Sequence, residues 1–337
     1  MKLEDLGERG LIERITKKFR VDNRIVTAGA GEDDCAIIDL DRAKNCYRYL
    51  VVTTDSLQQS THFPPGITPF QMGWSAVAVN LSDIAAMGAQ PFAFVIAMGI
   101  PTQTETSFME ELTAGIEDCA STYNTAVVGG DITQSRELIL TGTCLGFADN
   151  PIRRSGAKEG DLLCVTGSLG NAALALKIIT NKRKVPKSIE ELAKKALFQP
   201  QPRINEGIII TNSGVATAMI DISDGLALSI AEIAKSSNVG AELYEDSVPI
   251  LSDEIRDDKS FSLSKRELRA LALYYGGDYE LLFTIDRSAL ENDELMQRLK
   301  REVNMNVIGT IVPAEEGIYF KKSDKKELME IKGYQHF

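Results

Sequence analysis

The chain has 337 residues, of which 44% are hydrophobic and 25% charged, and this is enough to build two soluble domains of ordinary size. Its formal net charge of -11 argues against binding to nucleic acid or to anionic membranes, because both need a surplus of Lys and Arg. The charged first residues do not resemble a signal peptide, and no apolar run approaches the roughly 20 residues that span a bilayer.

The cysteines and histidines of the chain limit which metal sites and which cellular compartment we expect. Its five cysteines are scattered, with no two in a CxxC spacing, and it contains only two histidines. We therefore expect buried free thiols in a cytoplasmic protein, and we exclude a zinc site with several histidine ligands.

Alternating strand and helix patterns indicate an α/β protein. Residues 48–54 are rich in β-branched and aromatic side chains and predict a strand that ends at Asp55. The sequence Thr-Pro-Phe-Gln, from residue 68, is a helix start with a capping box, and Gly88 is a natural end for that helix. Residues 91–100 then predict a buried strand.

Three further elements complete the first predicted domain. A second capping box at Ser107 predicts a helix that reaches about Ala120. Residues 126–128 and 138–147 predict two more strands.

The predicted domain boundary lies just before Arg153 and divides the chain into residues 1–148 and 149–337. The details of the pattern do not indicate a single doubly wound sheet. Beyond the boundary the expected elements are a strand at 161–166, a tight glycine turn at 167–170, a helix at 171–180, a helix capped by Ser188, a loop at 199–203, a helix at 224–236 capped by Ser223, an exposed charge run at 253–265, and strands at 281–285 and 307–310.

Aspartates recur at one kind of position, which is the end of an apolar strand or the face of a capped helix. They are Asp33, Asp34, Asp55, Asp83, Asp131, Asp221 and Asp224. Any one of them alone is readily explained as an N-cap or a turn former. Asn80 and Asp83 stand three residues apart, so they share one face of their helix.

Charge repulsion decides what such a set of carboxylates can do if its members converge. Two unit charges about 4 Å apart interact by about 4 kcal/mol at an effective dielectric of about 20, so an uncompensated cluster would disperse or take up protons. Mg²⁺ relieves this repulsion, prefers oxygen ligands and typically bridges carboxylates to substrate phosphates. The pattern therefore predicts a magnesium-dependent site for a phosphate-bearing substrate.

The usual nucleotide-binding motifs are absent from the chain. It contains no GxxxxGK[ST] sequence. The glycine turn at residues 167–170 could cradle an anion, but we favour a simple tight turn. ATP would therefore be handled by clustered aspartates rather than by a P-loop.

A series of longer motifs narrows the sequence to one protein family. In chain order they are residues 29–36 (GAGEDDCA), 53–55 (TTD), 80–89 (NLSDIAAMGA), 129–131 (GGD), 154–157 (RSGA), 221–226 (DISDGL) and 278–281 (DYEL). Together they closely resemble the thiamine-monophosphate kinases, over nearly the whole chain. That family belongs to the superfamily of aminoimidazole ribonucleotide synthetase, selenophosphate synthetase and a hydrogenase maturation factor.

The resemblance implies both a fold and a reaction. The fold is a two-domain α/β fold, in which the mixed sheet of the N-terminal domain forms a barrel across the interface of a homodimer. The C-terminal domain is an α/β sandwich that completes the nucleotide and substrate site. The reaction is the Mg²⁺-dependent transfer of the γ-phosphoryl group of ATP to thiamine phosphate, by positioning and metal ions, without a catalytic side chain.

The resemblance also implies a role for individual residues. Several Mg²⁺ ions would be held by Asp34, Thr53, Thr54, Asp55, Asp83, Asp131, Asp221 and Asp224. ATP would be contacted by Gly130, Asp131, Arg154 and Ser223. The acceptor, thiamine phosphate, would be contacted by His62, Tyr334 and Asp278.

The chain departs from the family pattern at Gly277, where a substrate-contacting Glu is expected. A hydrogen bond to the pyrimidine end of the acceptor is then either lost or supplied by Asp278. Ordinary structural roles also remain open for three residues. Arg154 fits an exposed surface position, His62 fits a solvated loop, and Tyr334 fits a core position near the C-terminus.

Two other functions remain as alternatives. The first is a related ATP-dependent enzyme with a different acceptor. Its selenide and hydrogenase branches are disfavoured, because the first cysteine is Cys35 and the chain ends in Phe337. The second is a non-catalytic nucleotide-binding regulator, against which the complete set of aspartates argues, because binding alone would tolerate the loss of charge.

Overall fold

The computed structural model describes residues 14, 16–19, 26–28, 37–38, 48–181, 185–258, 263–322 and 325–335. Asp33 and Asp34 of the predicted site lie outside the described residues. The chain forms two compact units, which are described separately. The first unit comprises residues 1–84 and 89–149, and the second comprises residues 85–88 and 150–337.

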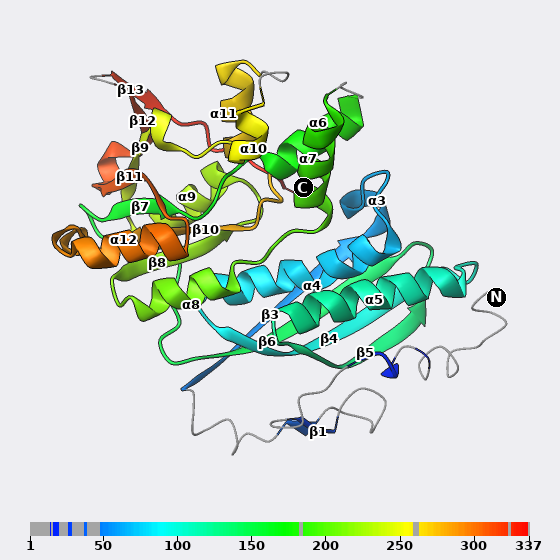
Figure 1. The fold of residues 1–337 in the computed structure, drawn as a ribbon. Helices are drawn as coiled ribbons and strands as arrows, with labels where there is room; N and C mark the ends of the chain where they lie inside the picture. The colour runs from blue at the N-terminus through cyan, green and yellow to red at the C-terminus, as the bar shows by residue number, and fades with distance from the viewer. Residues whose placement is uncertain are drawn as a thin grey trace. The chain divides into compact units, whose positions relative to one another are not determined.

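A mixed four-stranded sheet forms the first unit. Its elements are β3 (Tyr49–Gln58), α3 (Gln59–His62), α4 (Pro69–Ala86), β4 (Gln90–Ile100), α5 (Thr106–Thr122), β5 (Ala126–Gln134) and β6 (Ile139–Ala148), with a separate antiparallel pair of β1 (Val26–Ala28) and β2 (Ile37–Ile38). The strand order is β3-β6-β4-β5. β6 is antiparallel to both of its neighbours, whereas β4 and β5 are parallel. Helices α4 and α5 lie on one face of this sheet (Figure 1).

Local sequence explains how α4 begins, packs and ends. Its capping box is confirmed, because the Thr68 N–H donates to Gln71 Oε1 over 3.0 Å and the Gln71 N–H donates to Thr68 Oγ1 over 3.3 Å. Gly73 on α4 and Gly115 on α5 let the two helices approach closely, since a Cβ on either would overlap the main chain of the other helix. Gly88, at φ +63°, follows the end of α4 as predicted.

The four-stranded sheet has two free edges. β3 and β5 each pair with one neighbour only, so the described strands of a single chain do not close into a barrel. The two-domain α/β fold with mixed sheets is thus confirmed, and the described strands of one chain form no closed barrel.

A seven-stranded sheet forms the second unit, in the order β13-β12-β9-β11-β7-β10-β8. All of its pairs are antiparallel except β12 with β9. Its strands are β7 (Leu162–Val165), β8 (Ala216–Ile222), β9 (Gly240–Tyr244), β10 (Glu280–Ile285), β11 (Asn306–Val312), β12 (Ile318–Lys322) and β13 (Lys325–Leu328). Its α-helices are α6 (Asn171–Asn181), α7 (Lys187–Phe198), α8 (Ile204–Asn212), α9 (Leu226–Ser237), α10 (Asp253–Arg256), α11 (Lys265–Tyr274) and α12 (Asp293–Glu302).

The core of the second unit lies between this sheet and α9. Ile230 and Ile233 of α9 pack in one cluster with Leu163 of β7 and Leu282 of β10. Every residue of β10 is buried, as expected for a strand with neighbours on both edges and cover on both faces. This core fixes the position of the segment between β8 and α9, which carries two of the predicted aspartates.

Three aspartates that we expected to follow strands lie inside them. β3 continues past Asp55, β5 continues past Asp131, and β8 includes Asp221. In the ladders Asp55 lies opposite Gly142, Asp131 opposite Ala97, and Asp221 opposite Leu281. The neighbouring strand supplies pairing that the low strand propensity of Asp does not predict.

Three predicted helix caps are wrong. Ser107 and Ser188 lie inside α5 and α7, whose N-cap residues make no side-chain cap. Ser223 precedes α9 by too many residues, because the N-cap there is Gly225 at φ +107°. A side chain can cap the N-terminus of a helix only at the residue where the helix begins, and these helices begin at other residues. A capping box that was not predicted belongs to Ser264, inside the run of charges expected to be merely solvated.

Among the described helices, none is both long and apolar enough to cross a membrane.

One buried hydroxyl group in the second unit has no hydrogen-bond partner among the described residues, and it belongs to Thr211 on α8. Because an unsatisfied buried polar group costs about 1–3 kcal/mol, we expect Thr211→Val to leave the free energy of unfolding unchanged or raise it by about 1 kcal/mol. Urea denaturation of both proteins measures this difference. A loss of more than about 1 kcal/mol would show that the hydroxyl is satisfied in solution.

Candidate functional site

The contact between β3 and α4 brings together the predicted site residues of the first unit. Thr53 Oγ1 donates to Asp83 Oδ2 over 2.5 Å, and the Asp55 N–H donates to Asn80 Oδ1 over 3.1 Å. Thr53 and Asp55 are two residues apart on a strand, so both face α4. Asn80 and Asp83 are three apart on the helix and both face β3, as their spacing predicts.

Asn80 has a positioning role that was not predicted for it. It is fully buried, and its Nδ2 donates to Ala76 O over 3.0 Å, which fixes its amide plane. Its Oδ1 is therefore held toward the main chain of Asp55. Its three-residue distance from Asp83 was the only signal of this role in the sequence.

Thr54 and Asp131 lie on the other face of the same sheet. Thr54 Oγ1 donates to Gly142 O over 2.7 Å within the sheet. Asp131 stands in the row of Ala97, Thr141 and Ser56, and the latter two hydroxyl groups are 2.9 Å apart. Since β3 and β5 are three strand spacings apart, about 14 Å separates the Asp131 and Asp55 positions. The sheet of one chain does not gather these carboxylates into a single cluster.

The segment from Asp221 to Asp224 is held in place through its main-chain carbonyl groups. Ile222 O accepts from the Tyr279 N–H over 3.1 Å, and Ser223 O accepts from the Gly277 N–H over 2.9 Å. Asp224 O accepts from the Tyr334 N–H over 3.0 Å. Three parts of the predicted site, which are far apart in the sequence, therefore meet in the second unit: the Asp221–Asp224 segment, the chain around Asp278, and Tyr334.

The side chains of this segment are close to one another as well. Asp221 is only 7% exposed, and its Oδ1 lies 3.5 Å from Ser223 Oγ. Its carbonyl oxygen accepts from Ser229 Oγ over 3.0 Å, which ties β8 to α9. Two predicted ligands and one predicted ATP contact thus share a single strand-to-helix turn.

Asp278 caps the N-terminus of α6. Its carboxylate accepts from the Gly170 N–H over 2.6 Å and from the Ala172 N–H over 3.2 Å. Burial raises the pKa of Asp278 to about 7, although both amides favour the charged form. Gly277, next to it, has φ +96°, a backbone conformation in which a residue with a side chain would be strained. The role of Asp278 toward the acceptor stays a prediction, and its carboxylate already has main-chain partners.

Arg203 and Glu280 form an ion pair that was not predicted. Arg203 Nε and Nη2 donate to the two carboxylate oxygens of Glu280 over 2.8 and 2.6 Å. Thr166 Oγ1 also donates to Glu280 Oε2 over 2.6 Å. The Glu280 residue is 3% exposed, and a Cβ on Gly167 would overlap its carboxylate. The pair fastens the proline-containing loop before α8 to the start of β10.

Arg154 and His62 stand at exposed or partly exposed positions. Arg154 Nη1 lies 3.4 Å from Glu232 Oε2, with about half of each side chain exposed (55% and 46%). Such a pair contributes little to stability, so Arg154 can exchange this partner for a phosphate. His62 Nδ1 accepts from the Gln58 N–H over 3.0 Å, which leaves Nε2 as the protonated nitrogen of the neutral ring.

The donor atoms of the site suit a hard divalent cation. Carboxylate and hydroxyl oxygens, such as those of Asp83 and Thr53, are the ligands that Mg²⁺ prefers. Within the part of the chain that the structure describes, no three His, Cys, Asp or Glu side chains stand close enough to form a metal site. The predicted ligands are divided between the two units, and Asp34 lies outside the described residues.

The chain matches both domains of one protein family. Residues 32–148 match the N-terminal domain of the AIR synthase related proteins, and residues 158–321 match their C-terminal domain. A thiamine-monophosphate kinase from Methanospirillum hungatei is 40% identical over 262 residues, 77% of this chain and 82% of the relative.

Solved structures of the same kind superpose on the fold. The crystal structure of thiamine-monophosphate kinase from Stenotrophomonas maltophilia matches with a TM-score of 0.79 at 31% identity, over 92% of this chain and 95% of that one. A structure described as "AaThiL complexed with AMPPCP and TMP" matches with a TM-score of 0.74 at 28% identity, over 100% and 99% of the two chains.

The Arg203–Glu280 pair gives a stability prediction. Glu280→Ala removes both hydrogen bonds that Arg203 donates to this buried carboxylate and the one from Thr166, and leaves Arg203 the longer contact with Glu206, so we expect it to lower the free energy of unfolding by about 3 kcal/mol. Glu327→Ala is the matched control, because it breaks an ion pair with Arg269 in which Glu327 is 66% exposed. That change should cost less than about 1 kcal/mol. Equal losses in the two variants, measured by urea denaturation, would contradict the assignment.

The raised pKa of Asp278 gives a prediction for the pH dependence of stability. The folded state, with a pKa of about 7, holds a proton that the unfolded chain, with a pKa near 4, has released. This contribution to stability is complete below about pH 4 and is lost as the pH rises toward 7. Relative to Asp278→Asn, the wild-type free energy of unfolding should fall between pH 5 and pH 7, by up to about 1.4 kcal/mol per pH unit. Parallel curves for the two proteins would contradict the assignment.

Proposed function

Because the chain belongs to the thiamine-monophosphate kinases, within the AIR synthase related proteins, we propose that it phosphorylates thiamine phosphate with ATP to give thiamine diphosphate and ADP. The observation that carries the proposal is the Asp221–Asp224 segment. Its carbonyl groups bind the main chain of Gly277 and Tyr334, so residues assigned to metal, nucleotide and acceptor are parts of one hydrogen-bonded structure.

The reaction is a direct transfer between two anions. An oxygen of the acceptor phosphate attacks the γ-phosphorus of ATP, a new P–O bond forms, and the bond to the β-phosphate oxygen breaks as ADP leaves. No protein nucleophile takes part. The work of the protein is to align the two phosphates and to lower the repulsion between them.

Magnesium ions would be held by the carboxylates of both units. The residues assigned to this role are Asp34, Thr53, Thr54, Asp55, Asp83, Asp131, Asp221 and Asp224. When bound, Mg²⁺ neutralises the charge of the transferring phosphates. The hydrogen bond from Thr53 orients the Asp83 carboxylate, and the one to Asn80 fixes the main chain of Asp55.

The remaining residues bind the two substrates. For ATP they are Gly130, Asp131, Arg154 and Ser223, and for thiamine phosphate they are His62, Tyr334 and Asp278. The guanidinium group of Arg154 is exposed and can donate two parallel hydrogen bonds to a phosphate. We assign residues 1–148 to ATP and Mg²⁺ binding and dimerisation, and residues 149–337 to completion of the site.

A homodimer is part of the proposal. Leu50 and Val52, on the edge strand β3, are 50% and 60% exposed on the face of the sheet away from α4. Leu145 and Val95 are only partly buried in the apolar cluster that neighbouring strands form. Exposed apolar surface of this kind marks an interface, and a second copy packed here would close two open sheets into a barrel. We place the enzyme in the cytoplasm, which the free, buried Cys119, Cys144 and Cys164 support.

One observation favours a second candidate, which is a kinase of the same type with a different acceptor. Gly277 offers no side chain at the position where a substrate-contacting Glu is expected. The acceptor therefore has to be tested directly.

The test is to incubate the protein with Mg²⁺ and ATP and to offer thiamine phosphate or free thiamine in parallel. We expect thiamine diphosphate from thiamine phosphate alone. Asp83→Asn keeps an oxygen for the hydrogen bond from Thr53 but removes a charge, and it should lower the rate by about 100-fold or more. Asp149→Asn, at an exposed position in the same unit, is the control and should keep the wild-type rate.

Two results would overturn the proposal. Product from free thiamine alone would contradict the acceptor, and a wild-type rate in Asp83→Asn would contradict the metal assignment.

A further inference from the structure

The C-terminal strap, residues 329–335, follows β13 and runs beside α9. One end is fixed in the core, where Met329 is 6% exposed and its N–H donates to Ile318 O over 3.0 Å. The other end is fixed where the Tyr334 N–H donates to Asp224 O over 3.0 Å. The strap thus connects the edge of the sheet to the Asp221–Asp224 segment.

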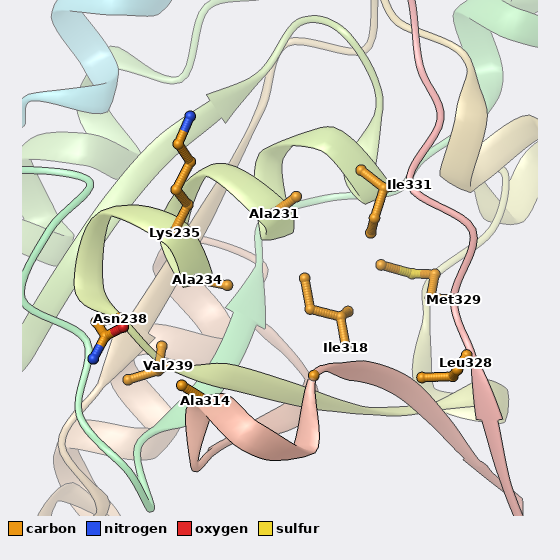
Figure 2. Close-up of a pocket in the computed structure, with 11 residues that line it drawn as sticks. Ala231, Ala234, Lys235, Asn238, Val239, Ala314, Ile318, Leu328, Met329 and Ile331 are labelled. Atoms are coloured by element: carbon orange, nitrogen blue, oxygen red, sulfur yellow. The ribbon is translucent and has the colours of Figure 1, made fainter.

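Between these two ends the strap does not fill the space against α9. A groove of about 550 Å³ remains there, lined from α9 by Ala231 and Ala234 and from the strap by Met329 and Ile331. Figure 2 shows Ile331 and Met329 facing this groove from the strap. Ile331 is still 44% exposed, so its side chain fixes the strap only weakly. The far end of the strap is held by the contacts of Gly333 and Tyr334.

Gly333 allows the strap to approach this closely. A Cβ at that position would overlap both the carbonyl oxygen of Asp224 and the side chain of Leu228. The nearest alternative, Ala, would therefore push the Tyr334 N–H away from its acceptor. Gly333 therefore makes room for the hydrogen bond that the N–H of the next residue, Tyr334, donates to Asp224 O.

The hydrogen bond lies at a point where the main chain needs to be fixed. Gly225, next to Asp224, has φ +107°, and glycine has access to many other conformations. Gly277 and Tyr279 hold the carbonyl groups of Ser223 and Ile222, and the strap holds the next one. The strap therefore fixes the main chain from which the Asp224 carboxylate projects.

We propose that the C-terminal strap is a positioning element for the metal-binding carboxylate of Asp224. The main-chain N–H of Tyr334, admitted by Gly333, carries this role, which is separate from any contact of the Tyr334 ring with the acceptor. The inference rests on the proposed function for the assignment of Asp224 to metal, but its test does not require turnover.

The test compares Tyr334→Ala with Tyr334→Pro. Both variants lose the ring, but only Pro also loses the N–H. Titration with Mn²⁺ in the presence of AMPPCP, followed by electron paramagnetic resonance, should show affinity about tenfold weaker in the Pro variant than in the Ala variant, the effect of one hydrogen bond. The thermal unfolding midpoints without metal should be similar. Equal Mn²⁺ affinities in the two variants would overturn the proposal.

Gly333→Ala provides a second test that keeps every N–H in place. It should weaken Mn²⁺ binding about as much as Tyr334→Pro, and the addition of Leu228→Ala should not restore it, because the overlap with Asp224 O remains. Ile331→Ala, in the same strap, is the control and should bind Mn²⁺ like the wild type. Restoration by Leu228→Ala would overturn the proposal. A difference in Mn²⁺ affinity in a protein that fails to phosphorylate thiamine phosphate would refute the proposed function and leave the strap assignment standing.

Discussion

The negative charge of the predicted aspartate ligands is the constraint on which the proposed site depends. The chain carries a net charge of -11, and its predicted ligands are almost all aspartates. Neutral donors hold them in place, since Thr53 donates to the Asp83 carboxylate and main-chain amides donate to carbonyl groups of the Asp221–Asp224 segment. Neutral donors orient a carboxylate but leave its charge in place, as the proposed cation binding requires. In that proposal an anionic substrate binds together with the cations.

Both units hold their aspartates in the same way. Each places aspartates within strands, where main-chain pairing with a neighbour fixes the direction of the side chain: Asp55 and Asp131 in the first unit, and Asp221 in the second. A helix or turn packed beside the strand then supplies a hydrogen-bond partner, such as Asn80 for the main chain of Asp55. The resulting precision is what the proposed direct phosphoryl transfer needs, because that reaction depends on positioning.

Spacing along the sequence predicted those parts of the site whose residues lie close together in the sequence. Asn80 and Asp83 were assigned to a common helix face by their spacing, and that face meets Thr53 and Asp55 on β3. Asp inside a strand was missed, because its pairing depends on another strand. The Arg203–Glu280 pair joins residues 77 positions apart, and no short motif marks it. The bond from Tyr334 to Asp224 depends on the path of the chain after β13, which no periodicity describes.

The most direct test of this account is the binding of AMPPCP to the wild-type protein by calorimetry, with Mg²⁺ and then with EDTA. If the aspartates bind the nucleotide only through cations, AMPPCP should bind in the presence of Mg²⁺ and fail to bind in EDTA. Equal affinity under both conditions would contradict the account, because the nucleotide would then be recognised by protein groups alone.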